Sequence, residues 1–417
     1  MPLSFSLLTT ATLSTTELTN FLRSSFRGEN WEIISPDLTT NDPDKLQGVG
    51  AVQFCTITTI DESPLEKGLI WVGTDDGNLW LTRDGGKNWQ KLNERIPNNP
   101  HYWITRVTAS HHQPGRAYVS FTGFYWDDFR PFLYKTEDFG QSWVSISGNL
   151  PQDESINVIK EDRKNPNLLF VGTDKGVYVS LDGGQSWSRM KNNLPTVPVH
   201  DLVIHPREND LVVGTHGRGF FITDISPLQE LTPDVLAKDV YLFQIEPKVQ
   251  WIMPHQTVVS YQNFAGENEP HGVVINYYLK QPVEDGVIIK IMEGKRVINE
   301  LKGSNKAGLN RVEWYMTKKR KRTKEEIVRW EKEQELLKNM VEFYCHYDEV
   351  DYYGDPDEEV DKWGRSLRTY ILHRPGMTDR LYAYTRVRPG NYKAVLLCGG
   401  KKLIRNVLIL KDYWYDD

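Results

Sequence analysis

The chain has 417 residues, of which 39% are hydrophobic, and a formal net charge of −6, so two or three packed domains are expected. The negative charge gives no general case for binding nucleic acid or an anionic membrane, and no run is long and apolar enough to span a bilayer. The cysteines, Cys55, Cys345 and Cys398, are far apart and form neither a metal-ligand spacing nor a disulfide framework. We expect no cofactor and no metal.

The N-terminal residues 1–19 carry no periodic pattern and are left unassigned. No Lys or Arg precedes their apolar part, which makes this stretch a poor secretory signal. Residues 20–35 predict a strand, a turn and a second strand, the outer half of a four-stranded repeat whose inner half is missing. The chain therefore enters the pattern in the middle of a repeat, and we expect a truncated product or one domain of a split protein.

One turn-like pattern, Ser/Thr-x-Asp-x-Gly-x-x-Trp, recurs along the first half of the chain. Intact copies occupy residues 82–89, 136–143 and 180–187, and a worn copy at 24–31 has Phe26 in place of the Asp. Successive copies start 58, 54 and 44 residues apart. A recurrence of roughly 40–50 residues is typical of a propeller or a solenoid.

The residue types of this repeat suit a tight turn between two strands. The Asp and Ser/Thr side chains can accept or donate hydrogen bonds within the turn, Gly supplies backbone freedom, and Trp can pack between neighbouring sheets. We interpret the repeat as structural and not catalytic. Its residues are Thr82, Asp84, Gly86, Trp89, Thr136, Asp138, Gly140, Trp143, Ser180, Asp182, Gly184 and Trp187.

Alternating apolar residues and Gly/Asp punctuation predict successive four-stranded blades. The first starts near residue 52, the second covers 103–146, the third 156–190, and the fourth starts at 199. The fourth meets Pro227 without a repeat turn, which indicates the last, atypical blade, and we expect residues 240–243 to supply its outer strand.

From about residue 258 the pattern changes to strands at sandwich-like spacing, at 272–279, 286–291, 310–314, 390–397 and 403–410. An insertion at about 317–375 interrupts them. It opens with a basic cluster, which we interpret as a solvated helix start, and continues into a helix at 325–341. The acidic loop 348–361 lacks the EF-hand spacing of carboxylates, and we expect no metal there.

These residues resemble a known family. The copies at Thr82, Thr136 and Ser180 look like the Asp-box, or BNR, repeats of sialidases, sortilin-type receptors and photosystem II assembly-factor-like propellers, within the wider WD40/YVTN/BNR-like group. The runs 194–207 and 213–219 are similar to the large bacterial sortilin-like proteins often labelled "glycosyl hydrolase, BNR repeat". Parts of the tail, such as 306–312 and 388–392, resemble their immunoglobulin-like domain.

The resemblance covers about residues 27–412 and completes the expected organisation. We expect an all-β chain, with a β-propeller of about four to five blades, complete or incomplete, at 20–253. An immunoglobulin-like β-sandwich with a charged helical insertion follows at 254–417. Family members are longer, so a partner chain or a second copy could complete the propeller. The resemblance implies an extracytoplasmic location, periplasmic or secreted.

The expected ligand face follows from strand direction. In Asp-box propellers the box joins the third and fourth strands, so turns between second and third strands, and the starts of inner strands, lie on the opposite face. The longest such turn carries residues 125–130. Aromatic, acidic and arginine side chains together suit a sugar or a peptide. The candidates are Asp76, Tyr102, Trp103, Arg106, Trp126, Asp127, Asp128, Arg130, Asp174, His200, His216 and Arg218.

These candidates do not compose a recognisable catalytic set. We cannot place the arginine cluster and tyrosine nucleophile of a sialidase, and nothing selects a pair of acids roughly 5–10 Å apart, as a two-carboxylate glycosidase needs. We therefore expect a non-catalytic binding or scaffold protein for a protein, peptide or glycan, with no assigned catalytic residue. The alternative is a glycoside hydrolase-like enzyme of sialidase or xyloglucanase type, acting at the propeller top face through acids such as Asp76, Asp127 and Asp174.

Overall fold

The computed structural model describes residues 5–6, 12–14, 19–24, 28–46, 54–191, 193–251, 270–347 and 380–412. Contacts divide the chain into two units, Met1–Val235 and Leu236–Asp417, which are treated separately below. Short helices accompany the strands of the first unit: α1 (Pro43–Leu46), η1 (Asn93–Arg95), η2 (Phe124–Trp126) and α2 (Ser226–Glu230). The short helix α3 (Pro233–Leu236) spans the boundary between the units. In the acidic loop expected at 348–361, the residues lie outside the described ranges.

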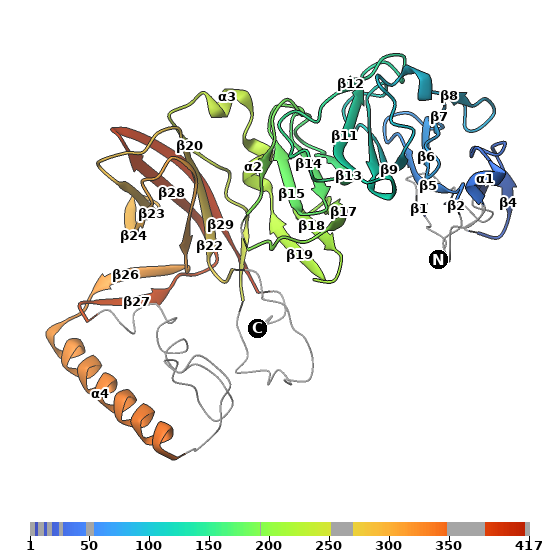
Figure 1. The fold of residues 1–417 in the computed structure, drawn as a ribbon. Coiled ribbons are helices and arrows are strands. Elements are labelled where there is room, and N and C mark those ends of the chain that lie inside the picture. The colour runs from blue at the N-terminus through green and yellow to red at the C-terminus, as the bar shows by residue number, and fades with distance from the viewer. Residues whose placement is uncertain are drawn as a thin grey trace. The chain divides into compact units, whose positions relative to one another are not determined.

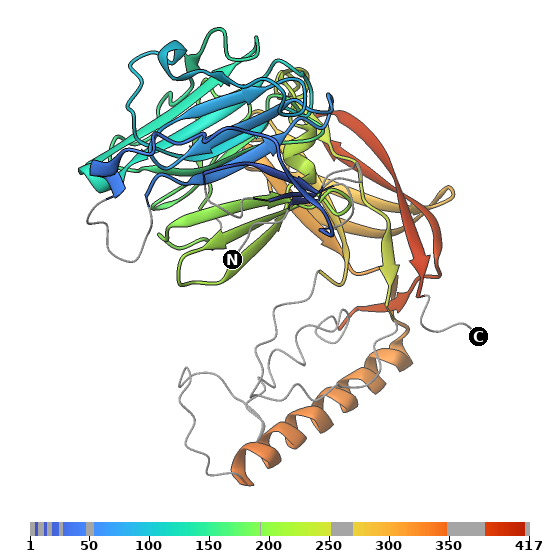
Figure 2. The ribbon, with the colours of Figure 1, turned by 90° about the vertical axis from the view of Figure 1, so that its right-hand side faces the viewer.

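The first unit is a succession of antiparallel sheets in which each strand pairs with the next along the chain (Figures 1 and 2). The all-β, propeller-type prediction is confirmed by these meanders. The first sheet contains β1 (Phe5–Ser6), β2 (Thr12–Ser14), β3 (Leu22–Ser24) and β4 (Trp31–Ile33). The expectation that residues 20–35 form the outer half of a repeat without its inner half is therefore wrong, because β1 and β2 of the unassigned segment pair in line with β3 and β4.

The following sheets are β5 (Ile57–Glu62), β6 (Ile70–Thr74), β7 (Leu79–Thr82) and β8 (Gln90–Lys91); β9 (Trp103–Ala109), β10 (Ala117–Gly123), β11 (Asp128–Thr136) and β12 (Val144–Ser145); β13 (Ile156–Glu161), β14 (Leu169–Thr173), β15 (Gly176–Ser180) and β16 (Ser188–Arg189); and β17 (Val199–Ile204), β18 (Asp210–Thr215) and β19 (Phe220–Asp224).

Neighbouring sheets pack face to face through apolar layers. Trp71 of β6 shares a buried cluster with Val119 of β10, and Phe170 of β14 shares another with Leu202 of β17. Such alternation of inward apolar residues is what the period-2 pattern predicts. Each layer removes large side chains from water, at roughly 25 cal/mol for each Å² of apolar surface, and this holds successive sheets together.

The repeated turn has the same hydrogen bonds in all three intact copies. In the first, the Thr82 hydroxyl donates to Asp84 at 2.9 Å, and the amides of Gly86 and Asn88 donate to Thr82 Oγ1 at 3.0 Å and to Asp84 Oδ1 at 2.9 Å. The copies at Thr136 and Ser180 repeat this pattern within 0.2 Å. Hydrogen bonds from Asn88 lower the pKa of Asp84 to about 2, so its carboxylate stays ionised.

The tryptophan of each turn reaches the preceding sheet. Trp89 Nε1 donates to the carbonyl of Ile34 at 2.8 Å, and Trp187 Nε1 donates to the carbonyl of Ile146 at 2.8 Å. Trp143 instead packs edge to face on Trp71, with ring centroids 6.0 Å apart. The repeat therefore forms a local turn and also fastens one sheet to the next.

We expect Gly86→Ala to lower the free energy of unfolding by about 2–3 kcal/mol, because a side chain there is both strained and crowded. Gly86 has a φ of +97°, and a Cβ would lie 2.4 Å from the carbonyl oxygen of Ile34. Urea unfolding measures the loss. Gly85→Ala is the matched control, since φ is also positive but the nearest atom is an Arg23 side-chain nitrogen at 3.5 Å. Equal losses in the two variants would contradict the close approach.

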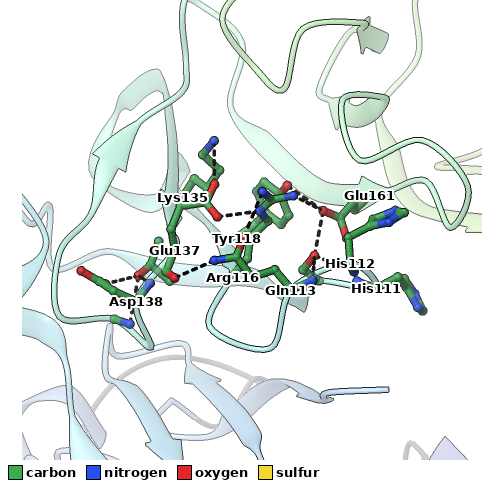
Figure 3. Close-up of polar contacts among 12 residues, drawn as sticks. His111, His112, Gln113, Arg116, Tyr118, Lys135, Glu137, Asp138 and Glu161 are labelled. Carbon is green, nitrogen blue, oxygen red and sulfur yellow. Dashed lines mark hydrogen bonds and ion pairs between the residues drawn. The ribbon is translucent and has the colours of Figure 1, made fainter. Parts of the chain in front are cut away.

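A buried carboxylate joins the β9–β12 and β13–β16 sheets (Figure 3). Glu161 accepts hydrogen bonds from the hydroxyls of Ser110 and Tyr118, both at 2.9 Å, and from the amide of His111 at 2.7 Å. Nη1 of Arg116 lies 3.5 Å from the Glu161 carboxylate. Nε of the same arginine lies 2.8 Å from the carboxylate of Glu137. Burial, and then the nearby Glu161, raise the pKa of the Tyr118 hydroxyl, so it remains a donor.

The same cluster makes stability sensitive to acid. Burial, and then Arg163 and Lys160, lower the pKa of His111 to about 4, below its usual 6.5. A histidine with a depressed folded pKa adds stability that is present above about pH 6.5 and is lost as the pH falls toward 4. We expect His111→Gln to reduce the fall in unfolding free energy between pH 7 and pH 4.5 by about 1–2 kcal/mol, after allowance for partial exposure of the ring. Urea unfolding across this range measures it, and His101→Asn, at an exposed ring, is the control. An unchanged pH slope in His111→Gln would contradict the assignment.

The second unit has two sheets around one apolar core. One is β20 (Val240–Leu242), β22 (Val273–Leu279) and β25 (Gly308–Trp314); the other is β21 (Lys248–Gln250), β29 (Lys401–Lys411), β28 (Gly390–Cys398), β23 (Val287–Glu293) and β24 (Arg296–Gly303). Tyr277, Ile289 and Leu396 are buried between them. The expectation that residues 240–243 complete the fourth blade is wrong: β20 pairs with β22, where Val240 and Leu242 join this core.

The basic cluster is a strand and not a helix start. β26 (Thr317–Lys321) pairs with β27 (Tyr382–Arg386), and α4 (Lys324–Tyr347) follows, so the helix in the insertion is confirmed. A capping box starts the helix, with Thr323 and Glu326 exchanging hydrogen bonds at 2.9 and 3.3 Å. Arg320 forms an ion pair with Glu326 at 2.7 Å, so one positive charge of the basic cluster is balanced by a neighbouring carboxylate of α4.

Candidate functional site

Exposed aromatic side chains gather at one end of the β9–β12 sheet. β10 ends at Gly123, η2 follows, and Asp127 takes a left-handed φ of 53° that turns the chain into β11. The three residues of η2 and Phe129 are between 39% and 63% exposed. We call the following set the aromatic platform: Tyr102, Trp103, Phe124, Tyr125, Trp126 and Phe129.

The platform is built from two stacked pairs. Tyr102 and Trp126 are 5.0 Å apart between ring centroids with planes 23° apart, and Trp103 and Tyr125 are 5.7 Å apart with planes 8° apart. Each pair joins a residue at the start of the inner strand to a residue of η2. Tyr125 and Trp126 meet edge to face at 88°, so the two stacks form neighbouring, differently oriented surfaces. The rings thus fix one another while leaving apolar faces in water.

A charged pair borders the platform. Arg130 donates to both oxygens of Asp128, from Nε at 2.9 Å and from Nη2 at 2.7 Å, and the Tyr102 hydroxyl donates to Asp128 at 3.2 Å. The hydrogen bonds from Arg130 lower the pKa of Asp128 to about 2. The Arg130 guanidinium also lies over the ring of Phe132, at 5.3 Å. At neutral pH the border therefore carries a fixed carboxylate and a fixed guanidinium beside exposed aromatic rings.

A second polar group joins the inner strands β9 and β17. Arg106 Nη2 lies 3.0 Å from Asp201 Oδ1. These residues belong to the first strands of two sheets, β9 and β17, and the sheet that begins with β13 lies between them in chain order. His200 and His216 are 5.5 Å apart between ring centroids. The Arg106 Nε atom is buried without a hydrogen-bond partner among the described residues, so this side chain has donor capacity left over.

The remaining candidates differ in how accessible their side chains are. Asp76 is buried and accepts hydrogen bonds from the Thr74 hydroxyl and the Thr40 amide, so we leave it out of the proposed site. Asp174 accepts from Asn157 at 3.0 Å. Asp127 is exposed at the turn after η2, and Arg218 is exposed in the turn between β18 and β19.

Sequence reasoning did not single out several residues of this end. Phe124 extends the aromatic run, Phe132 packs on Tyr102 at 5.7 Å, and Phe54 lies 6.4 Å from Trp126. Asp201 was also missed as the partner of Arg106. The sequence could have pointed to Phe54 and Asp201, because each lies just before or near the start of an inner strand, on the expected ligand face. It could not have pointed to Phe132, since that residue lies inside a strand like any core aromatic residue.

Within the described ranges, no three His, Cys, Asp or Glu side chains come together in a way that could hold a metal ion. No helix in the part of the chain that the structure describes is long and apolar enough to cross a membrane. At the β10–β11 connection, the aromatic faces, the Tyr102 hydroxyl and the Asp128–Arg130 pair together suit recognition of a ligand.

No family model and no curated protein match the sequence. Among solved structures, the chain is similar to the GH74 xyloglucanase from Xanthomonas campestris at 16% identity and a TM-score of 0.40, over 70% of this chain and 40% of that one. It is similar to the extracellular domain of BT4673 from B. thetaiotaomicron at 13% identity and a TM-score of 0.38, over 98% of this chain and 44% of that one. It is also similar to YCF48 from Cyanidioschyzon merolae at 20% identity and a TM-score of 0.29, over 40% of this chain and 55% of that one. The chain thus spans less than half the length of the first two.

Proposed function

We propose that this chain is a non-catalytic binding protein and that the aromatic platform recognises a glycan. The observation that carries the proposal is the pair of neighbouring aromatic stacks that stay exposed beside an ionised Asp128–Arg130 pair. The apolar faces of sugar rings can stack on exposed aromatic rings. A carboxylate and a guanidinium side by side offer acceptors and donors to neighbouring hydroxyls.

A preformed platform favours binding because little side-chain freedom remains to be lost. Trp126 stacks on Tyr102, meets Tyr125 edge to face and lies 6.4 Å from Phe54 between ring centroids, which restricts its rotamers before a ligand arrives. Arg130 is held in place by two bonds to Asp128. Rigid aromatic anchors of this kind dominate the free energy of many interfaces.

The alternative, a glycoside hydrolase, has less support. Asp128 is occupied by Arg130 and has a pKa of about 2, which does not suit a general acid at neutral pH. Asp76 is enclosed by hydrogen bonds. We further propose, from the resemblance of residues 194–207 and 213–219, a sortilin-like relationship and an extracytoplasmic location. From the resemblance of residues 306–312 and 388–392 we propose an immunoglobulin-like second unit.

The proposal is tested by titrating the full chain with a panel of soluble oligosaccharides and polysaccharides while following tryptophan fluorescence, with calorimetry on each hit. We expect saturable binding to at least one glycan and no release of reducing sugar. Release that Asp127→Asn abolishes would establish the hydrolase instead. Binding to extended peptides from a second panel, with no binding to glycans, would show that the platform recognises peptides and would overturn the glycan proposal.

A further inference from the structure

The last sheet of the first unit ends in an open edge. Its strand order is β17-β18-β19, and no fourth strand follows β19 in the described part of the chain (Figure 1). The amide of Thr215 bonds Gly219 at 3.1 Å and the amide of Ile225 bonds Asn209 at 3.0 Å, on either side of the Val213–Phe221 pair. Because main-chain groups alternate in direction along an antiparallel strand, those of Phe220, Ile222 and Asp224 face away from β18.

The same strand exposes large apolar side chains. Phe220 is 78% exposed and Ile222 is 66% exposed. Ile222 lies in register with Val212, and Val212 lies in register with Val203, which makes an apolar row across one face of the sheet. An exposed apolar edge strand is a ready template for another strand, and proteins usually protect such edges with charges or prolines. Between Phe220 and Thr223 β19 contains neither.

We propose that β19 is a homodimerisation edge, where β19 of a second copy pairs with it in antiparallel orientation and makes a continuous six-stranded sheet. Placing Phe221 opposite Phe221 of the second copy sets Phe220 opposite Ile222. All the residues that would then exchange main-chain bonds have outward-facing groups, as an antiparallel ladder requires. The pairing has twofold symmetry, the commonest arrangement of soluble oligomers.

Charge complementarity selects this register and this partner. The same alignment brings Arg218 of one copy opposite Asp224 of the other, twice across the twofold axis. Arg218 is exposed, and no ion pair joins it to a residue in the described ranges. Shifting the register to place Ile222 opposite Ile222 would set Phe220 against Asp224 and leave Arg218 opposite Ser226. Apolar and opposite-charge pairs across neighbouring strands stabilise a sheet, so the first register is favoured.

The test is sedimentation equilibrium of the full chain over a wide range of concentration. We expect a species of twice the 48.3 kDa of one chain, in a concentration-dependent equilibrium because a strand edge is a small interface. Arg218→Glu and Asp224→Arg should each raise the dimer dissociation constant at least tenfold, and the double variant should recover most of the loss. Arg207→Glu, at an exposed arginine in the same unit, should leave it unchanged.

Two controls keep the outcome interpretable. Asp224 Oδ1 accepts hydrogen bonds from Ser226, so Ser226→Ala reports the effect of losing that contact without a charge change. Circular dichroism checks that each variant is folded. A chain that stays monomeric throughout overturns the proposal, and slow amide exchange at Phe220 and Ile222 in that monomer would show that the same chain covers the edge. A dimer that Arg218→Glu and Asp224→Arg both leave intact also overturns it, because its interface lies elsewhere.

Discussion

Glu161→Ala should lower the free energy of unfolding by about 3–5 kcal/mol, the range for removing one partner from a buried charge network. The side chain of Glu161 is fully buried and accepts from Ser110, Tyr118 and the amide of His111. Alanine would leave these donors and Nη1 of Arg116 without this acceptor, between two sheets that pack on each other, while Arg116 keeps its contact with Glu137. Urea unfolding of the full chain, followed by tryptophan fluorescence, measures the change.

Glu137→Ala is the matched control, since Glu137 binds the same Arg116 at 2.8 Å but is 41% exposed. Its loss should stay within about 1 kcal/mol, as for other surface ion pairs. If Glu161→Ala cost no more than Glu137→Ala, the buried carboxylate would not hold the two sheets together.

Trp126→Ala should weaken binding of the glycan by about ten- to a hundredfold, which corresponds to ~1.4–2.8 kcal/mol. The indole contributes an exposed face, and it also contacts Phe54, Tyr102 and Tyr125, so its removal loosens the rest of the platform. Calorimetric titration of the glycan identified in the screen measures the loss.

Trp31→Ala provides the control for this variant. Trp31 is 40% exposed, close to the 45% of Trp126, and lies on β4 of the same unit, away from the β10–β11 connection. We expect the dissociation constant of the glycan from Trp31→Ala to match that from the wild type. A similar loss in both variants would point to a general effect on the fold, and no loss in Trp126→Ala would remove the platform as the binding site.

Much of the fold is predictable because its instructions are local. The repeated turn closes through bonds between residues two and four apart, such as Thr82 to Asp84 and Asn88 to Asp84, so eight residues contain the whole pattern. The meander of strands follows from alternation and short turns. The local pattern places the strand at residues 240–243 in the wrong sheet because the pairing partner of a strand is not local, and β22 lies about thirty residues further on.

The basic cluster shows a similar limit. Its charge suggested solvated helix, whereas Thr323 and Glu326 mark the true helix start with a capping-box spacing that the sequence already contains. The strand before it depends on β27, which lies about sixty residues away, and no local pattern reveals that pairing.

For the candidate site, the sequence alone determined which end of the sheets to consider, because strands reverse direction at every turn. It placed Trp126, Asp128 and Arg130 together in one long connection. Only the tertiary structure separated them from Asp76, which follows a second strand in the same way. Asp76 is enclosed because residues near Thr40 cover it, while Trp126 stacks on Tyr102 and keeps part of its surface in water. Burial depends on which distant segment packs over a residue, and the local sequence does not contain that information.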